Sequence, residues 1–189
     1  MDQGDEHLLS LLASDLDDHF RQLVEVYQQR LYLFAKRLVG RPDDAEDIVQ
    51  EAFLRAYYAL KGTPTRKIRI LNLRKWLYTI TLNIFRNGTR KRERHVISLD
   101  LPESGTALDI ADQALGPDEE AHWREWRHEL EAHIASLPEH YRPAVTLYLF
   151  EELSYAEIAE LLQQPIGTVK VYISRAKYRL RHLLEPRTE

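Results

Sequence analysis

Apolar residues recur at helical spacing along most of this chain, and no segment alternates apolar and polar residues as a half-buried strand would. The first long apolar stripe lies within residues 20–38, with Asp17 or Asp18 as the expected N-cap and Gly40 as the expected end. A second helix should begin at Pro42, because a first helical turn tolerates proline and the acids that follow suit the helix dipole. The pattern therefore predicts an all-α fold.

The chain divides into two helical regions around a polar segment. A third helix is expected over about 72–94, and it is the last helix of the N-terminal region. Residues 96–120 have weak periodicity, contain prolines and glycines, and carry seven acids without a Lys or Arg, which indicates a linker. We predict two small helical domains, an N-terminal one over 15–95 and a C-terminal one over 121–186, joined by this acidic linker.

The C-terminal domain contains the most specific pattern in the chain. An amphipathic helix comes first, and Pro138 is expected to open the next helix. Ser154 is expected to cap a short helix over 155–162, and after a turn Thr168 is expected to cap the last, longer helix. A short helix, a turn and a longer basic helix form a helix-turn-helix, the unit that places a helix in the DNA major groove.

The last helix separates apolar from basic residues. At roughly 100° per residue, one stripe should pack against the short helix, and it consists of Val169, Ile173, Ala176, Leu180 and Leu183. On the opposite face, Ser174 and Arg175 can read base edges and Val171 can contact a thymine methyl group. A helical hairpin packed on a partner is the alternative, but such faces rarely carry five Lys and Arg and no acid, as residues 168–184 do.

The net charge of −4 conceals a strong segregation of charge. Residues 61–94 carry eleven Lys and Arg against one acid, and the last helix is also basic. Two basic segments separated by an acidic linker indicate two contacts with one long polyanion. The chain has no cysteine, and the histidines at 122–140 lack the i, i+4 spacing of a zinc pair, so we expect no metal site. Apolar runs are too short to span a membrane and the N-terminus is acidic, which predicts a cytoplasmic protein.

The segment LPEHYRPAVTLYLFEELSYAEIAELLQQPIGTVKVYISRAKYRL closely resembles the C-terminal promoter-binding domain of bacterial sigma factors. It is similar to the extracytoplasmic-function (ECF) type of the sigma-70 family, in which the pieces YAEIA and GTVK are especially typical. The resemblance implies that the last helix reads the −35 promoter element. The residues expected to contact this element are Thr168, Lys170, Val171, Tyr172, Ser174, Arg175, Lys177, Tyr178 and Arg181.

The segment DDAEDIVQEAFLRAYYAL resembles the helix with which these sigma factors bind core RNA polymerase. Its outer face is acidic but includes Leu54 and Tyr58, which suits a basic helical partner. The resemblance implies that this partner is the clamp coiled coil of the polymerase's largest subunit. The expected contacts are Asp44, Asp47, Gln50, Glu51, Leu54, Arg55 and Tyr58. The alternatives are a solvated face, or carboxylates that bind a divalent ion in a nucleic-acid-processing enzyme.

The segment LRKWLYTITLNIFRNGTRKRER resembles the helix that melts and binds the −10 element. Its buried side is expected to consist of Leu73, Trp76, Leu77, Ile80 and Ile84. Phosphates and bases would contact the stripe beside it, for which we expect Lys75, Trp76, Thr79, Asn83, Arg86, Arg90 and Lys91. Trp76 suits either a core position or a stacking platform. The preceding basic loop over 61–72 matches the position at which family members capture a flipped base.

We therefore expect a sigma factor that binds core RNA polymerase and directs promoter-specific initiation at −35 and −10 elements. It would need no cofactor and contain no catalytic residues, because the phosphodiester chemistry belongs to the polymerase. Free of polymerase, its two domains would pack together or be held by an anti-sigma protein, either of which would hide both basic faces. The alternative is a stand-alone helix-turn-helix regulator that binds duplex DNA without polymerase.

Overall fold

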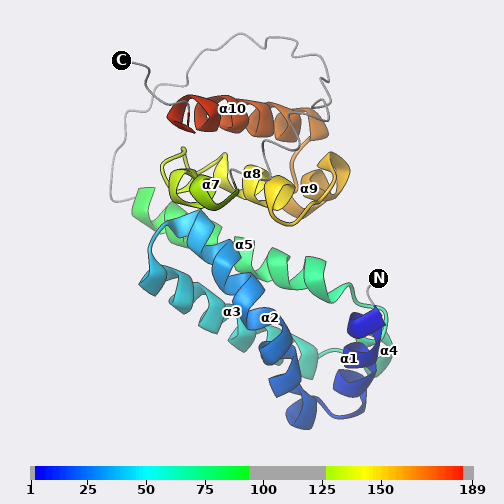
Figure 1. The fold of residues 1–189 in the computed structure, drawn as a ribbon. Helices are drawn as coiled ribbons and strands as arrows, with labels where there is room; N and C mark the ends of the chain where they lie inside the picture. Colours follow the sequence, from blue (N-terminus) through cyan, green and yellow to red (C-terminus); the bar gives the residue numbers. More distant parts are fainter. Residues whose placement is uncertain (1–2, 94–126, 185–189) are drawn as a thin grey trace.

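The computed structural model describes residues 3–93 and 127–184 of the 189-residue chain. The predicted all-α fold is confirmed, and no strand occurs within these ranges. Figure 1 shows two groups of helices stacked on each other, α1 to α5 in one and α7 to α10 in the other, with α5 along the boundary. The predicted linker over 96–120 lies outside the described residues.

The N-terminal group is built around a long central helix. Its elements are α1 (Gln3–Ser14), α2 (Leu16–Val39), α3 (Pro42–Lys61), α4 (Thr65–Ile68) and α5 (Leu73–Glu93). Helix α2 packs against α1, α3 and α5. Phe34 of α2 is fully buried and meets Tyr78 of α5 edge to face, with ring centroids 4.7 Å apart. The apolar stripe predicted within residues 20–38 is thus the centre of the core.

The ends of α2 are set by short polar and glycine residues. The N-cap is Asp15 rather than the predicted Asp17 or Asp18, because its carboxylate accepts from the backbone N–H groups of both at 3.0 and 3.1 Å. Gly40 ends the helix as predicted, with φ of 75°. A Cβ atom at this position would lie 2.8 Å from the Cβ atom of Ala135, so glycine is also needed for the close approach of the C-terminal group.

Two elements at the far end of the N-terminal group were not predicted. Helix α1 buries Leu8, Leu9 and Leu12, and the Tyr27 hydroxyl donates to the Asp5 carboxylate at 2.6 Å. This helical unit therefore begins well before residue 15. The predicted basic loop contains the four-residue helix α4, against which α1 packs.

The C-terminal group contains α7 (Arg127–Ile134), α8 (Arg142–Leu149), α9 (Tyr155–Leu162) and α10 (Ile166–Leu184). Ser154 caps α9 as predicted, in a capping box with Glu157. The prediction that Pro138 opens a helix was wrong, because residues 139–141 form a turn and Pro143 lies in the first turn of α8.

Two predictions about α10 were wrong. Thr168 is not its cap: the backbone N–H of Val169 already donates to the carbonyl oxygen of Pro165 at 3.1 Å, so the helix begins at Ile166. Leu183 is 50% exposed although it continues the apolar stripe. The later turns of α10 pack against α7 and α8, where Leu180 belongs to the same buried cluster as Leu130, and Leu183 is not part of that cluster.

The main apolar core spans both groups, and the C-terminal group also has a second core of its own. The main cluster of buried residues includes Phe34 and Tyr78 from the N-terminal group and Leu147, Ile158 and Val169 from the C-terminal group. Contacts across the boundary join α2 to α7 and α8, and α5 to α9. The arrangement of the two candidate DNA-binding helices is therefore fixed by packing between the groups.

Candidate nucleic-acid interface

Helix α10 turns a fully apolar side inward and its polar residues outward. Val169, Ile173, Ala176 and Leu180 are each at most 1% exposed, as their spacing predicts. Of the residues predicted to contact the −35 element, Tyr178 and Arg181 are exposed. The half-buried ones are Thr168, Lys170, Val171, Tyr172, Ser174, Arg175 and Lys177.

Tyrosines outside the predicted site hold several of these side chains. The Tyr148 and Tyr155 rings stack with centroids 5.3 Å apart, and the Lys177 ammonium lies 4.2 Å from the Tyr148 ring centroid. Tyr172, a predicted DNA contact, packs edge to face against Tyr141 at 5.5 Å. Sequence reasoning missed this support because helical periodicity does not show which aromatic residues of separate helices meet.

Helix α5 is buried on more than the predicted side. Leu73 and Leu77 are fully buried as expected, whereas Trp76, Ile80 and Ile84 are half-buried. The fully or nearly fully buried positions also include Tyr78, Thr81, Leu82 and Phe85. The reason is the place of α5 at the boundary, where helices of both groups cover it. Trp76 packs against the shared core.

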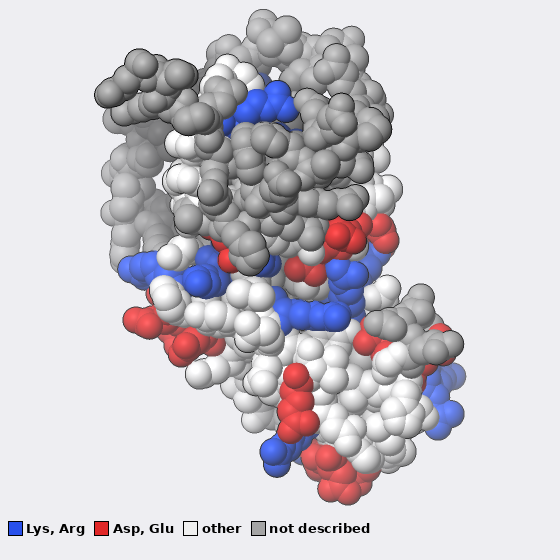
Figure 2. Space-filling view, viewed as in Figure 1, with Lys and Arg blue, Asp and Glu red and all other residues white. Residues whose placement is uncertain are grey.

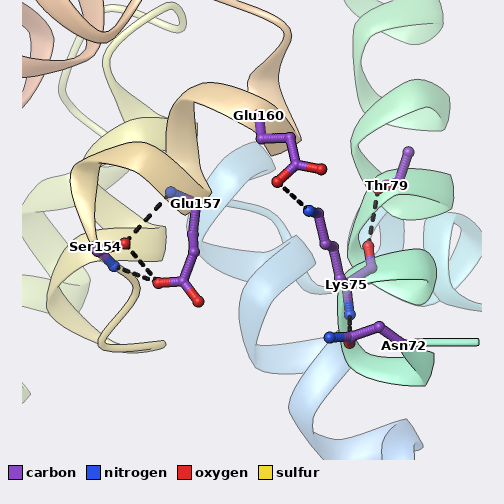
Figure 3. A network of polar contacts seen from close by, with 6 residues as sticks. All are labelled: Asn72, Lys75, Thr79, Ser154, Glu157 and Glu160. Atoms are coloured by element: carbon purple, nitrogen blue, oxygen red, sulfur yellow. Dashed lines mark hydrogen bonds and ion pairs between the residues drawn. The ribbon is translucent and has the colours of Figure 1, made fainter. Parts of the chain in front are cut away.

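The polar stripe of α5 faces α9 in this arrangement (Figure 3). The Lys75 ammonium forms an ion pair with the Glu160 carboxylate, and Arg86 donates to the Leu162 carbonyl oxygen at 2.8 Å. Thr79 donates to the Lys75 carbonyl oxygen within the helix, and Asn83 is exposed. Arg90 and Lys91 lie in the last turns of α5, and their side chains are outside the described set. Two predicted −10 contacts are therefore engaged by the other group.

Residues that no local pattern indicates form a polar cluster beside this stripe. Arg74 donates to the carbonyl oxygen of Glu151 at 2.6 Å and to its carboxylate at 3.1 Å, and the Tyr78 hydroxyl donates to the same carboxylate. Burial, and then the nearby charge of Glu151, raises the pKa of Tyr78 above its ordinary value. Tyr78 thus stays protonated and keeps its role as a donor across the boundary.

Two further arginines connect α2 with the C-terminal group. The Arg37 guanidinium donates to the Glu131 carboxylate and lies over the Phe150 ring, 3.8 Å from its centroid. Arg142 donates to the Leu38 carbonyl oxygen at 2.8 Å. Burial lowers the pKa of Arg142. In Figure 2, Lys and Arg side chains form a band along the boundary with acidic side chains beside them.

The candidate polymerase face on α3 is open. Leu54 is 51% and Tyr58 64% exposed, among polar residues of the same helix face. Arg55 donates to the Glu51 carboxylate at 2.7 Å, and Asp44 forms an ion pair with Arg41. Asp47 and Gln50 are also exposed. The structure therefore brings all seven predicted contacts to one surface that the C-terminal group does not cover.

In the described ranges, no group of three or more His, Cys, Asp or Glu residues is arranged to hold a metal ion. Among the same residues, no helix has the length and apolar character needed to cross a membrane.

Comparisons with known proteins match both groups of helices. The model of Sigma-70 region 2 matches residues 23–95, and that of Sigma-70, region 4, matches residues 127–180. The ECF RNA polymerase sigma factor SigW of Bacillus subtilis is 33% identical over 173 residues, which cover 88% of this chain and 89% of that protein. The RNA polymerase sigma-H factor of Pseudomonas aeruginosa is 34% identical over 188 residues, covering 97% and 95%.

A solved structure has the same fold. It is the co-crystal structure of the sigma factor RpoE from Bartonella quintana in complex with the anti-sigma factor NepR. The alignment has a TM-score of 0.59 at 28% identity and covers 89% of this chain and 98% of that one.

Proposed function

The chain belongs to the sigma-70 family of RNA polymerase sigma factors, to its ECF type, and from this premise we propose which surfaces carry its function. It binds core RNA polymerase and directs initiation at promoters. Helix α3 contacts the polymerase, α10 reads the −35 element and α5 binds the −10 element. Sigma factors are not enzymes, and this one supplies no catalytic group and acts in the cytoplasm.

The observation that best supports this assignment is the division of α10 into two sides. Four apolar residues anchor it to the C-terminal group, whereas Tyr178 and Arg181 extend into solvent. Cations on an anchored helix can contact phosphates on both sides of a major groove, while Ser174 and Arg175 between them reach base edges. A helix packed into a protein partner would need apolar residues on that side.

We propose further that the described arrangement is a closed form. Lys75 and Arg86 cannot hold phosphates while they are bound to Glu160 and Leu162. The two groups must therefore separate before α5 binds the −10 element, and binding to polymerase is the event that separates them. An anti-sigma protein, the kind of partner seen with the related RpoE, would hold the free chain inactive.

Transcription with purified components tests the proposed function. The chain is mixed with core RNA polymerase and a library of randomised promoters, and run-off transcripts are sequenced. We expect a common start site preceded by two conserved elements. If no library member gives transcripts above those of core polymerase alone, and the chain binds duplex DNA tightly by itself, the stand-alone regulator is correct instead.

A further inference from the structure

Two tyrosines from different helices form a stacked pair beside α10. The Tyr148 ring of α8 and the Tyr155 ring of α9 are nearly parallel, with an angle of 12° between their planes and centroids 5.3 Å apart. Both helices pack against α10 and against each other (Figure 1). Neither tyrosine is among the residues predicted to contact DNA. We call this pair, Tyr148 and Tyr155, the tyrosine platform.

The tyrosine platform is fixed from behind. Tyr148 packs against both clusters of buried residues, the main core and the second core of the C-terminal group, and Tyr155 packs against the main core. Tyr155 is the first residue of α9 and directly follows the Ser154 cap, so the capping box also sets its backbone. Both side chains are only half-buried, so part of each ring lies outside the core. The platform therefore has a fixed position relative to α10.

Two lysines of α10 lie over this platform. The Lys177 ammonium is 4.2 Å from the Tyr148 ring centroid, and the Lys170 ammonium is 5.8 Å from the Tyr155 ring centroid. Both distances are within about 6 Å, the range in which a ring face attracts a cation, and the shorter one gives the stronger contact. Both lysines are half-buried, whereas Arg181 further along the helix is exposed. The platform therefore orders both lysines, and Lys177 more than Lys170.

The order of these lysines matters for DNA. Lys170 and Lys177 are seven residues apart, so they point in nearly the same direction, about 10.5 Å apart along the helix axis, and each can bind a different phosphate. A lysine loses rotamer freedom when it binds a phosphate, and a side chain that is already ordered loses less. A ring occupies only one side of an ammonium group, whose other N–H donors can still reach a phosphate. Prior ordering thus strengthens phosphate binding without adding a charge.

We infer that Tyr148 is a positioning residue for −35 binding, because its ring holds the Lys177 ammonium where a phosphate of the −35 element will lie. Tyr155 supports that ring through the stack and orders Lys170. The inference rests on the proposed function, in which α10 binds the −35 element. It adds to the site two residues of α8 and α9 that need touch no base. Their effect on affinity is equal for all sequences, since phosphates carry no direct sequence information.

A double-mutant cycle on the holoenzyme tests this role. The Kd for a duplex promoter is measured by fluorescence anisotropy over a range of salt concentrations. Tyr148→Leu should raise the Kd about fivefold and keep the salt dependence, because the charge of Lys177 remains. Tyr148→Met, which fills the same space without a ring, should repeat this result. Tyr148→Phe keeps the ring and should stay within about twofold of the wild type.

Lys177→Ala supplies the second side of the cycle. It should raise the Kd and reduce the slope of log K against log salt concentration by about 1, because one phosphate contact is lost. In this background, Tyr148→Leu should change the Kd by less than about twofold, since no ammonium is left for the ring to position.

The other outcomes contradict the positioning role. If Tyr148→Leu weakens binding equally in both backgrounds, the ring supports the fold and does not act through Lys177. If Tyr148→Leu tightens binding, the ring and the phosphate compete for the ammonium. If Tyr148→Phe loses as much as Tyr148→Leu, the hydroxyl group rather than the ring is responsible. A wild-type holoenzyme that binds and transcribes no promoter would instead contradict the proposed function.

Discussion

The Arg86 guanidinium donates to the main-chain carbonyl oxygen of Leu162 at 2.8 Å, so a predicted DNA contact binds the last residue of α9. A cation is favourable at this point because the carbonyl groups at a helix C-terminus carry partial negative charge. If α5 binds the −10 element as proposed, phosphates and α9 compete for the same side of α5. A substitution in the nearby Lys75–Glu160 ion pair would reveal this competition as a change in affinity for −10 DNA.

Glu160→Lys should favour separation of the groups, because it replaces the partner of Lys75 with a like charge. Both side chains are partly exposed, so the pair contributes at most about 1 kcal/mol. We expect the free protein to bind single-stranded −10 DNA about two- to fivefold more tightly, measured by fluorescence anisotropy.

Glu25→Lys is the matched control for this variant. It makes the same change of charge at an exposed ion pair on α2. Equal gains in both variants would mean that added positive charge, rather than release of α5, causes the tighter binding.

Leu54→Asp should weaken binding to core polymerase and leave the fold intact. Leu54 is 51% exposed, so an acid there meets water in the free protein but disturbs an apolar contact in the complex. We expect the Kd to rise at least about tenfold, measured by competition for core polymerase. Leu183→Asp, at an equally exposed leucine of α10, should keep the wild-type Kd. If the two substitutions raise the Kd equally, α3 is not part of the interface.

Arg175→Ala should change which sequence is preferred within the −35 element. A base contact is worth about 1–3 kcal/mol at one position, so the preference for that base pair should weaken selectively. Arg181→Ala, at an exposed residue near the end of α10, should weaken binding to all sequences alike. A uniform loss in Arg175→Ala, measured on a set of single-base variants, would make it a phosphate contact.

Arg37→Ala should destabilise the fold by about 2 kcal/mol, because it leaves the Glu131 carboxylate and the Phe150 ring without their cation. Denaturant unfolding measures this change. Arg21→Ala removes an exposed ion pair of the same helix and should cost less than about 0.5 kcal/mol. Equal effects of the two substitutions would show that the Arg37 contacts do not join the groups.

Ser154→Ala should destabilise the chain by about 1 kcal/mol at neutral pH through loss of the N-cap of α9. The Ser154 hydroxyl and N–H donate to the Glu157 carboxylate and lower the pKa of Glu157 below 4.5. A lowered pKa means that this contribution is present above pH 4.5 and is lost as the pH falls through the folded value. The stability difference between wild type and variant should therefore shrink on acidification.

Ser10→Ala, at an exposed serine of α1, is the control and should remain close to the wild type at every pH. A difference between wild type and Ser154→Ala that is independent of pH would show that the capping box does not depend on the charge of Glu157.

Local signals in the sequence predicted most helices. Gly40, Pro42 and Ser154 act within a few residues of themselves, so their effects on helix ends can be read from the chain. Thr168 shows the limit of such reasoning. Gln163 adopts a left-handed conformation with φ of 53°, which ends α9 and lets α10 begin at Ile166, two residues before the residue that resembles a cap.

The contacts between the groups had no signal in the sequence. Arg74 and Glu151 are 77 positions apart, and Arg37 and Glu131 are 94 apart. Helical periodicity showed that α5 has an apolar side, but not that α9 of the second group packs against α5, as α2 and α3 do. The predicted contacts on α3 lie on one open face, and those on α10 include half-buried side chains such as Tyr172, which packs against Tyr141. The predicted contacts on α5 lie at a boundary between helix groups that the sequence does not reveal.

Leu147 and Ile158 belong to the core that both groups share, and this core limits how stable an open form of the chain can be. Separation of the groups exposes apolar surface on both of them to water, and exposed apolar surface associates with other apolar surfaces. An open molecule without a bound partner would close again or aggregate, so the open form persists only when another protein covers the exposed surface. Under the proposed mechanism, binding of core polymerase and release of α5 from the C-terminal group therefore occur in a single step.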